Sequence, residues 1–463
     1  MKQILSLWQN SITRRLCRTA VVQAKRLYRR SFLRQLVRWV DKRILRSRPV
    51  RYFIDPTYLT DAWYASFLYQ KGTRGIRRIL AHVPKSALPW NSLYISAFLA
   101  VVLLLPHHLW ADSLLSLLFL LPAVVFVSHH ARTQTGTVFL LLNAILLVFQ
   151  LLFAIALPKT AADALRYLLL GIDFFFLVSF AIRTTEDFVK NLRGFYSILM
   201  LLCALGLLQQ ELWGEAAHAT LPSGVALGEV VVLLFPFAFL APLSFASRKR
   251  QLFYLIPLLM LSFTLVTATR SRGALIGFSA ELLVLILLLD WRYLPLLLFL
   301  APTLTNTALE NIAAMWSLPK SHGNFFMNLI ESFRTFWHNG FGVDRTFFLD
   351  YYKGTVLHPP SATGISPLYF SILAEMGLLG LFAFLVYLLR IAHNTLTSIF
   401  TAEKDLKGYF AAGFAMLVGI SVSSLVSSTF FSPRILLTYW GMLGMLRAAR
   451  IIRYVDESPR FMV

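Results

Sequence analysis

The stretch of sequence that decides the fold runs from Thr267 to Phe278 and reads T-A-T-R-S-R-G-A-L-I-G-F. It places Arg270 and Arg272 between two long apolar runs, Leu252–Val266 and Ala274–Leu289. Runs of this kind predict helices that cross the hydrocarbon core of a bilayer. A charge at the centre of a bilayer costs about 2.5–3.5 kcal/mol, so arginines within a membrane are candidates for function. The alternative is that both arginines are anchors at a membrane interface.

The rest of the chain has the composition of a membrane protein. Of its 463 residues, 57% are hydrophobic and 14% are charged, and the mean hydropathy is +0.65. Apolar runs of about 18–22 residues recur along the chain, and each is long enough to cross a bilayer as a helix. The sequence therefore predicts an all-α polytopic membrane protein and excludes a soluble enzyme.

About twelve helical spans are expected. They lie near 92–109, 113–129, 136–157, 164–182, 193–210, 224–246, 251–268, 272–289, 292–308, 365–390, 408–430 and 433–449. A transmembrane domain thus covers residues 91–450, preceded by a basic region at 1–90 and followed by a tail at 451–463. Within that domain, the connection 309–364 is expected to form one large loop outside the membrane.

The first 90 residues carry most of the positive charge. They hold 20 Lys and Arg residues against 3 Asp residues, while the whole chain has a net charge of +22. Apolar residues such as Leu5, Trp8 and Ile12 recur there at helical spacing, which is typical of an amphipathic helix lying among lipid headgroups. Next to a membrane domain, this pattern indicates binding to anionic membrane lipids and not to nucleic acid, and it indicates a cytoplasmic position.

The distribution of basic residues predicts the orientation of the spans. The connections at 183–193 and 247–250 are rich in Lys and Arg, whereas Gln210–Gly224 has neither. Connections rich in Lys and Arg face the cytoplasm, so both termini are expected to be cytoplasmic. With twelve spans, the connection that holds Arg270 and Arg272 then faces outward, as does the large loop.

Two acidic residues are predicted inside the membrane, Glu229 in the sixth span and Asp173 in the fourth. Glu229 is expected about one turn from the outer end of its span, where it either pairs with one of the arginines or acts as a base. Asp173 is as consistent with a structural polar contact as with a functional one. An ion-coupled transporter would need a chain of acidic residues through the bundle, and we expect only these two.

The outer connection 309–364 supplies two further ionisable candidates, His358 and Asp344. Its many Phe, Trp and Tyr residues predict a folded segment over the outer mouth of the bundle and not a disordered one. A histidine or a carboxylate in such a segment is a candidate proton acceptor. The sequence contains no motif for a zinc site or a nucleotide-binding fold.

Three motifs give the chain a resemblance to a known family. They are T-R-S-R-G-A at Thr269–Ala274, G-F-G-V-D at Gly340–Asp344 and L-A-E-M-G-L-L-G at Leu373–Gly380. In these motifs, and in their arrangement around a large outer loop, the chain resembles the O-antigen ligase/polymerase-like membrane proteins, which act on glycans linked to polyprenyl diphosphates. The resemblance covers roughly residues 135–450 and leaves the basic N-terminal region outside.

The resemblance implies a bacterial inner-membrane protein that transfers or polymerises glycan. The donor would be an undecaprenyl-diphosphate-linked glycan and the acceptor a second glycan or a lipid. The resemblance assigns Arg272, with Arg270 beside it, to binding of the diphosphate. The histidine and asparagine of the family motif fall on Ser366 and Pro367 in this sequence.

The resemblance also implies a reaction without a metal ion, a nucleotide or any other cofactor, because the lipid-linked donor is already activated. The proton of the acceptor would pass to His358, or else to Glu229 or Asp344. Replacement of the His-Asn pair leaves a second interpretation open. In that interpretation, the chain is a non-catalytic member of the family, or a transporter or assembly partner for lipid-linked glycans.

Overall fold

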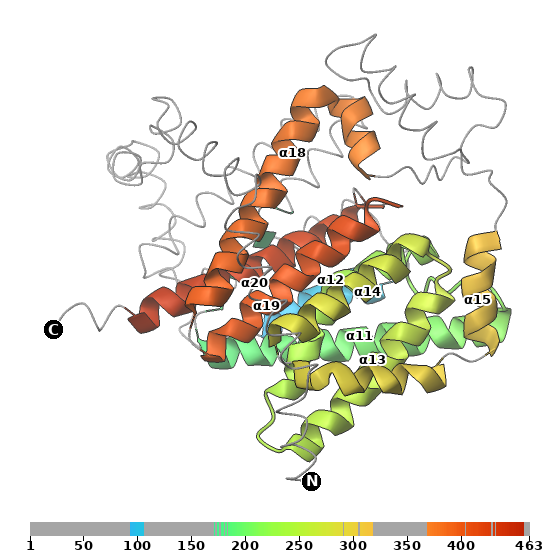
Figure 1. Cartoon of the computed structure of the whole chain (residues 1–463), viewed down its shortest axis with the longest axis horizontal. Helices are drawn as coiled ribbons and strands as arrows, with labels where there is room; N and C mark the ends of the chain where they lie inside the picture. Colours follow the sequence, from blue (N-terminus) through green and yellow to red (C-terminus); the bar gives the residue numbers. More distant parts are fainter. Residues whose placement is uncertain are drawn as a thin grey trace, which may run out of the picture.

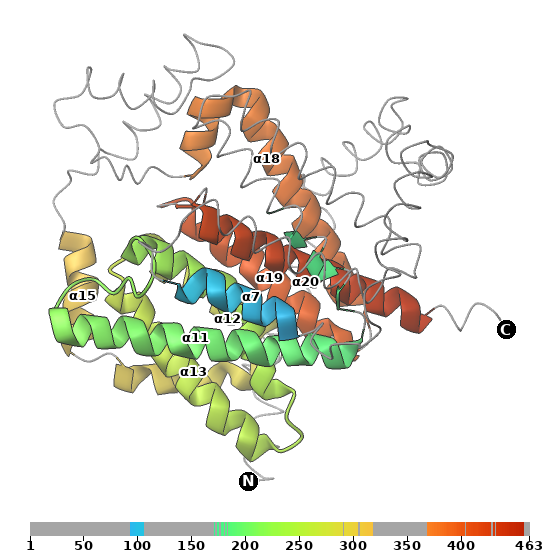
Figure 2. The same ribbon diagram turned by 180° about the vertical axis from the view of Figure 1, so that it is seen from behind.

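The computed structural model describes residues 93–105, most of 171–182, 184–289, 291–303, 306–317, 368–402, 404–426, 429–430 and 432–457. These residues form α-helices and one 3-10 helix, and no strand occurs among them. The elements are α7 (Leu93–Leu104), α11 (Thr185–Trp213), α12 (Gly224–Leu243), α13 (Arg248–Ala268), α14 (Arg272–Leu289), η2 (Trp291–Thr303), α15 (Asn306–Ser317), α18 (Leu368–Thr401), α19 (Lys404–Ser423) and α20 (Pro433–Glu457). Figures 1 and 2 show them from opposite sides.

Seven of the described helices are long and apolar enough to cross a membrane. They are α11, α12, α13, α14, the Gly380–Thr401 part of α18, most of α19 and most of α20. For the described residues, the prediction of an all-α polytopic membrane protein is therefore confirmed. The count of twelve spans stays a prediction, because the segments 113–129 and 136–157 lie outside the described residues, as do the basic region 1–90 and most of 309–364.

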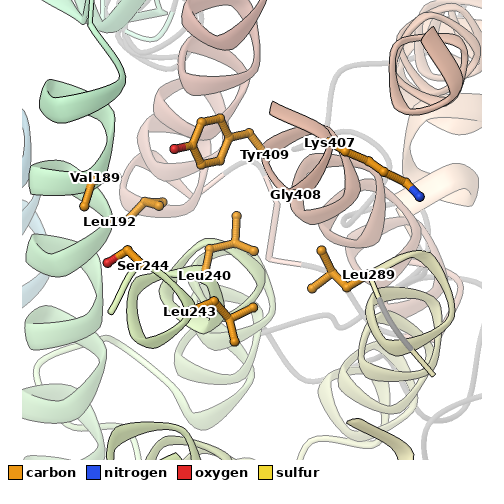
Figure 3. A pocket seen from close by; sticks show the side chains of 9 residues that line it. All are labelled: Val189, Leu192, Leu240, Leu243, Ser244, Leu289, Lys407, Gly408 and Tyr409. Atoms are coloured by element: carbon orange, nitrogen blue, oxygen red, sulfur yellow. The ribbon is translucent and has the colours of Figure 1, made fainter. Parts of the chain in front are cut away.

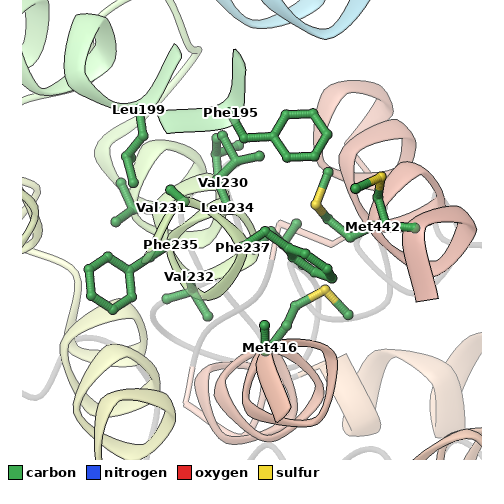
Figure 4. Close-up of a cluster of buried hydrophobic side chains, with 14 of the residues drawn as sticks. Phe195, Leu199, Val230, Val231, Val232, Leu234, Phe235, Phe237, Met416 and Met442 are labelled. Carbon is green, nitrogen blue, oxygen red and sulfur yellow. The ribbon is translucent and has the colours of Figure 1, made fainter. Parts of the chain in front are cut away.

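Helix α12 forms the centre of the bundle. Every residue from Ala226 to Pro242 is buried, as expected for a helix that is apolar on all sides and enclosed by other helices. Figure 4 shows its side chains meeting Phe195 and Leu199 of α11, Met416 of α19 and Met442 of α20. Helices α13 and α14 also pack against α12. Any polar residue on α12 is therefore held inside the protein.

Helices α7 and α18 lie at the edges of the bundle. Helix α7 lies along α11 on the side seen in Figure 2. Helix α18 packs against α19 and projects away from the other helices (Figure 1). It bends at Gly377, where φ is 68° and ψ is −173°, a conformation that is essentially restricted to glycine. The predicted span 365–390 thus contains two helical segments that meet at the first glycine of L-A-E-M-G-L-L-G.

Helix α11 begins earlier than the predicted span at 193–210. Thr184 caps it, because its hydroxyl oxygen accepts a hydrogen bond from the backbone N–H of Asp187 at 3.1 Å. Glu186 and Asp187 also suit the positive end of the helix dipole, and Lys190 pairs with Glu186 at 2.8 Å. Because of these local interactions, the residues just before position 193, which were predicted to form a connection, are the first turns of α11.

The predicted span at 292–308 is mainly a 3-10 helix, η2, and not an α-helix. η2 follows the end of α14 and lies along α13 and α14. At about 2.0 Å per residue its 13 residues extend about 26 Å, nearly the length of the 18-residue α14 at about 1.5 Å per residue. η2 therefore returns the chain to the opposite end of the bundle, where Asn311 of α15 meets Arg270.

Helices α14 and α19 approach closely because glycines lie between them. A Cβ atom at Gly277 of α14 would lie 2.7 Å from the backbone oxygen of Gly419 and 2.8 Å from the Cβ atom of Ser423. Small residues commonly allow such close approach between helices in membranes. The contact holds α14 against α19, and with it Arg272, the first residue of α14.

Candidate functional site

Helices α13 and α14 are joined by the arginine turn, residues 269–272. Thr269 ends α13, and its hydroxyl donates to the carbonyl oxygen of Val266 at 2.7 Å. Ser271 begins α14, because its hydroxyl oxygen accepts from the backbone N–H of Ala274 at 3.2 Å. Both side chains are buried. The T-R-S-R-G-A motif is therefore a helix end followed at once by a helix start, with the two arginines alternating with two buried hydroxyl residues.

Arg270 and Arg272 carry permanent positive charges at this end of the bundle. Arg270 has a φ of 52°, a left-handed conformation that is uncommon for a residue with a side chain. Its exposed guanidinium donates from Nε to Oδ1 of Asn311 at 3.0 Å and from Nη2 to the carbonyl of Gly214 at 3.5 Å. Arg272 is half-buried as the first residue of α14. The Arg270 side chain is thus oriented by α15, which lies across this end of the bundle in Figure 1.

The start of α12 lies directly against the arginine turn. A Cβ atom at Gly224 would lie 2.5 Å from the backbone oxygen of Thr269. One turn later, a Cβ atom at Gly228 would collide with the side chain of Ala274 in α14. A backbone oxygen cannot move aside as a flexible side chain can. The close approach of α12 to the arginines therefore requires glycine at position 224.

The connection between α11 and α12, residues 214–223, gathers further elements around the arginines. The backbone N–H of Ala217 donates to the carbonyl of Ala268 at 3.0 Å, next to the arginine turn. The hydroxyl of Thr220 donates to the carbonyl of Leu103 in α7. Together with the contact from Arg270 to Gly214, these bonds tie α7 and α13 to one short connection.

Arg434 adds a third arginine at the same end of the bundle. It lies in the first turn of α20, is 2% exposed, and donates from Nη1 to the carbonyl of Thr220 at 2.9 Å. Arg434 is not among the predicted site residues. It nevertheless lies at the start of the predicted span 433–449, which is expected to begin on the outer side, where Lys and Arg are scarce; an arginine there could have been identified as a candidate.

His218 is another polar residue that the sequence predictions missed. Its Nδ1 atom lies 3.1 Å from the carbonyl oxygen of Leu221, and its Nε2 atom contacts the amide nitrogen of Gln209. Since a carbonyl can only accept, these partners assign the proton to Nδ1 and make Nε2 the acceptor. Both ring nitrogens are therefore bonded to neighbouring residues, and His218 stabilises the 214–223 connection in place of acting as a free base.

Glu229, a predicted catalytic candidate, lies fully buried in α12. The backbone N–H of Thr429 lies 3.1 Å from both carboxylate oxygens, and the Thr429 hydroxyl donates to Oε2 at 2.8 Å. Thr429 belongs to the connection between α19 and α20, so Glu229 ties that connection to the central helix. Among the described residues its hydrogen bonds go to Thr429 and not to either arginine. This placement favours a positioning role over the role of a base.

Glu281 of α14 is a buried acid that the sequence predictions overlooked. It is fully buried, and neither carboxylate oxygen has a hydrogen-bond partner in the described part of the chain. The side chain faces α19, where a Cβ atom at Gly419 would lie 2.5 Å from Oε2 of Glu281. The expectation that Asp173 and Glu229 are the only acids inside the membrane is therefore wrong.

The structure thus places Arg270 and Arg272 in one turn, with Glu229 buried in the adjacent helix. Two other predicted candidates, His358 and Asp344, lie outside the described residues, and so does Asp173. Where the structure does describe the chain, no three His, Cys, Asp or Glu side chains gather closely enough to hold a metal ion.

Comparisons with known proteins find no family model that matches the chain and no curated protein that matches it. The chemistry of the site is therefore the guide to its function. Guanidinium groups bind phosphate oxygens through pairs of parallel hydrogen bonds and remain charged under all physiological conditions. The arginine turn is accordingly suited to an anion with several oxygens, such as a phosphate or a diphosphate.

Proposed function

We propose that the chain binds an undecaprenyl-diphosphate-linked glycan at the outer face of a bacterial inner membrane and transfers or polymerises that glycan. One observation carries the proposal: exposed Arg270 and half-buried Arg272 share a turn at one end of a bundle of apolar helices. A lipid diphosphate places its phosphates at the membrane surface, level with such a turn, while its hydrocarbon chain stays in the bilayer. The resemblance in T-R-S-R-G-A to the O-antigen ligase/polymerase-like proteins supports the same ligand.

The proposed reaction is a displacement at the anomeric carbon of the donor sugar. A hydroxyl oxygen of a glycan or lipid acceptor attacks this carbon, its bond to the diphosphate oxygen breaks, and undecaprenyl diphosphate departs. Arg270 and Arg272 stabilise the negative charge that develops on the departing oxygen. The hydroxyl proton passes to His358 or Asp344. Glu229 is a weaker candidate for this role, because its carboxylate already accepts hydrogen bonds from the backbone N–H and the hydroxyl of Thr429. The donor is already activated, so no cofactor is proposed.

Replacement of Arg272 or Arg270 with alanine should remove most glycan transfer. Loss of one group that stabilises a developing oxyanion lowers a rate by about 100- to 1,000-fold. The measurement is transfer from an undecaprenyl-diphosphate-linked glycan of the native host, with the purified chain reconstituted in liposomes. Lys190→Ala is the matched control, because Lys190 lies at the other end of the bundle and pairs with Glu186 on the surface. Transfer at the wild-type rate by the Arg272→Ala variant would contradict the mechanism.

The outward position of the arginine turn can be tested by chemical labelling. In a background with Cys17→Ser and Cys203→Ser, single cysteines are introduced as Glu215→Cys, beside the arginine turn, and Ser247→Cys, at the other end of the bundle; both positions are exposed. A membrane-impermeant maleimide added to intact spheroplasts should label the first variant and not the second, because basic connections stay in the cytoplasm. The reverse pattern would place the arginines inside the cell and exclude the proposed donor site.

The alternative function is a non-catalytic protein that binds or moves lipid-linked glycans. It is favoured by Ser366 and Pro367, which replace the histidine and asparagine of the family motif. Deletion in the native host separates the possibilities. Full-length polysaccharide without attachment indicates a ligase, and shortened chains indicate a polymerase. If the purified protein binds the lipid-linked glycan but transfers none, the non-catalytic alternative holds.

A further inference from the structure

A second candidate binding site lies at the end of the bundle opposite the arginine turn. It is a cavity of about 400 Å³ between α11, α12, α14 and the start of α19 (Figure 3). Most of its wall is apolar and includes Leu192, Leu240, Leu243 and Leu289. Its size falls within the range of about 300–1,000 Å³ that is usual for ligand sites. The proposed glycan reaction does not use this cavity.

The one charged side chain among the described residues that line the cavity is positive. Lys407 of α19 lies in the wall and is half-buried, and in the described part of the chain no carboxylate forms an ion pair with it. The first three residues of α13, Arg248, Lys249 and Arg250, are exposed at the same end of the bundle. A lysine at an apolar site buries its methylene groups and keeps its ammonium group at the polar edge. The cavity therefore suits a ligand that is apolar along its length and anionic at one end.

We propose that this cavity binds an acyl chain of an anionic phospholipid from the membrane leaflet at the basic end of the bundle, with the lipid phosphate at Lys407. The leucines supply contacts for the hydrocarbon chain, which a free phosphate ion could not use. Lys407 and the basic start of α13 supply attraction for the headgroup, which a zwitterionic lipid would use less well. The hydrocarbon chain thus distinguishes the proposed ligand from a free phosphate ion, and the anionic headgroup distinguishes it from a zwitterionic lipid.

Gly408 provides a means of filling the cavity. A Cβ atom at this position would lie 3.6 Å from Cδ2 of Leu240 and 3.7 Å from Cδ2 of Leu289, which is ordinary contact. A side chain at Gly408 would therefore begin without collision and extend among the lining leucines. Gly408→Leu should occupy space that the acyl chain needs.

The test is native mass spectrometry of the full chain in detergent, with phosphatidylglycerol and phosphatidylcholine that carry identical acyl chains. The wild-type protein should bind phosphatidylglycerol more tightly than phosphatidylcholine. Lys407→Gln should weaken phosphatidylglycerol binding by about fivefold, the effect of one basic residue near an anionic lipid. Gly408→Leu should weaken binding of both lipids, and excess inorganic phosphate should not displace phosphatidylglycerol.

Lys249→Gln is the matched control, because Lys249 is exposed at the same end but does not line the cavity. It should weaken phosphatidylglycerol binding less than Lys407→Gln does. Equal losses would indicate general attraction to the basic surface and overturn the site. Equal binding of the two lipids by the wild-type protein, or displacement of phosphatidylglycerol by inorganic phosphate, would overturn it as well. Circular dichroism of each variant separates loss of binding from loss of folding.

Discussion

Replacement of Glu281 with methionine is expected to raise the free energy of unfolding by about 1–3 kcal/mol, the usual cost of a buried polar group without a partner. Glu281 is fully buried in α14, and neither of its carboxylate oxygens is hydrogen-bonded within the described part of the chain. Methionine has a similar length and is flexible enough to fit the same space against α19. Most substitutions in a protein core destabilise it, so a gain in stability is a distinctive result.

The same replacement at Glu229 is expected to act in the opposite direction. Glu229 is equally buried, but its carboxylate accepts hydrogen bonds from the backbone N–H and the hydroxyl of Thr429. Glu229→Met would leave both donors without this acceptor, at a cost of about 1–3 kcal/mol. The two variants are matched in chemistry and in burial, so the difference between them isolates the hydrogen bonds to Thr429.

Both variants can be compared by reversible unfolding in mixed detergent micelles, followed by circular dichroism. A more stable Glu281→Met variant that also retains the proposed glycan transfer would show that Glu281 has no part in the proposed reaction. A fall in stability would mean that the Glu281 carboxyl group makes interactions that help to hold α14 against α19. Stability of Glu229→Met equal to that of the wild-type protein would contradict the structural role given to Glu229.

The helical membrane fold could be predicted from the sequence because length and hydropathy determine it directly. The arginine turn was also predictable, since two charges between apolar runs stand out in any topology. Its geometry was not, because Gly224 and Asn311, which shape it, are far from the turn in sequence and have no charge. Contacts of this kind depend on which helices become neighbours.

The type of helix at 292–308 could not be predicted, because a continuous apolar run does not distinguish a 3-10 helix from an α-helix. The apolar run at 292–308 predicted a span, but its residues adopt a 3-10 helix that covers nearly the same length with fewer residues. The partner of Glu229 was missed for a different reason. Thr429 is 200 positions away in the sequence, and a threonine in a connection gives no signal that it faces a buried carboxylate.

Substitution of Gly277 with alanine is expected to destabilise the protein, whereas the same change at Gly408 is expected to stabilise it. A Cβ atom at Gly277 would lie 2.7 Å from the backbone oxygen of Gly419 and 2.8 Å from the Cβ atom of Ser423. Neither atom can move without shifting α19, and overpacking of this kind costs about 1–3 kcal/mol. At Gly408 the atoms nearest to a Cβ atom would lie at 3.6 and 3.7 Å, so the methyl group of alanine causes no clash. Alanine also favours the helical conformation over glycine by roughly 0.5–1 kcal/mol, so the free energy of unfolding should rise by about this amount.

The effect of Gly277→Ala should extend beyond stability to the arginine turn. Helix α14 begins at Arg272, and its contact with α19 at Gly277 lies little more than one turn further along. A displacement of α14 at that point would carry Arg272 with it, and a misplacement of about 1 Å at a reacting group can lower a rate by roughly 100-fold. We therefore expect Gly277→Ala to lose the proposed glycan transfer even at temperatures where circular dichroism shows it folded, with Gly408→Ala as the control that retains the proposed activity. Normal transfer by folded Gly277→Ala protein would show that the α14–α19 contact does not position the arginines.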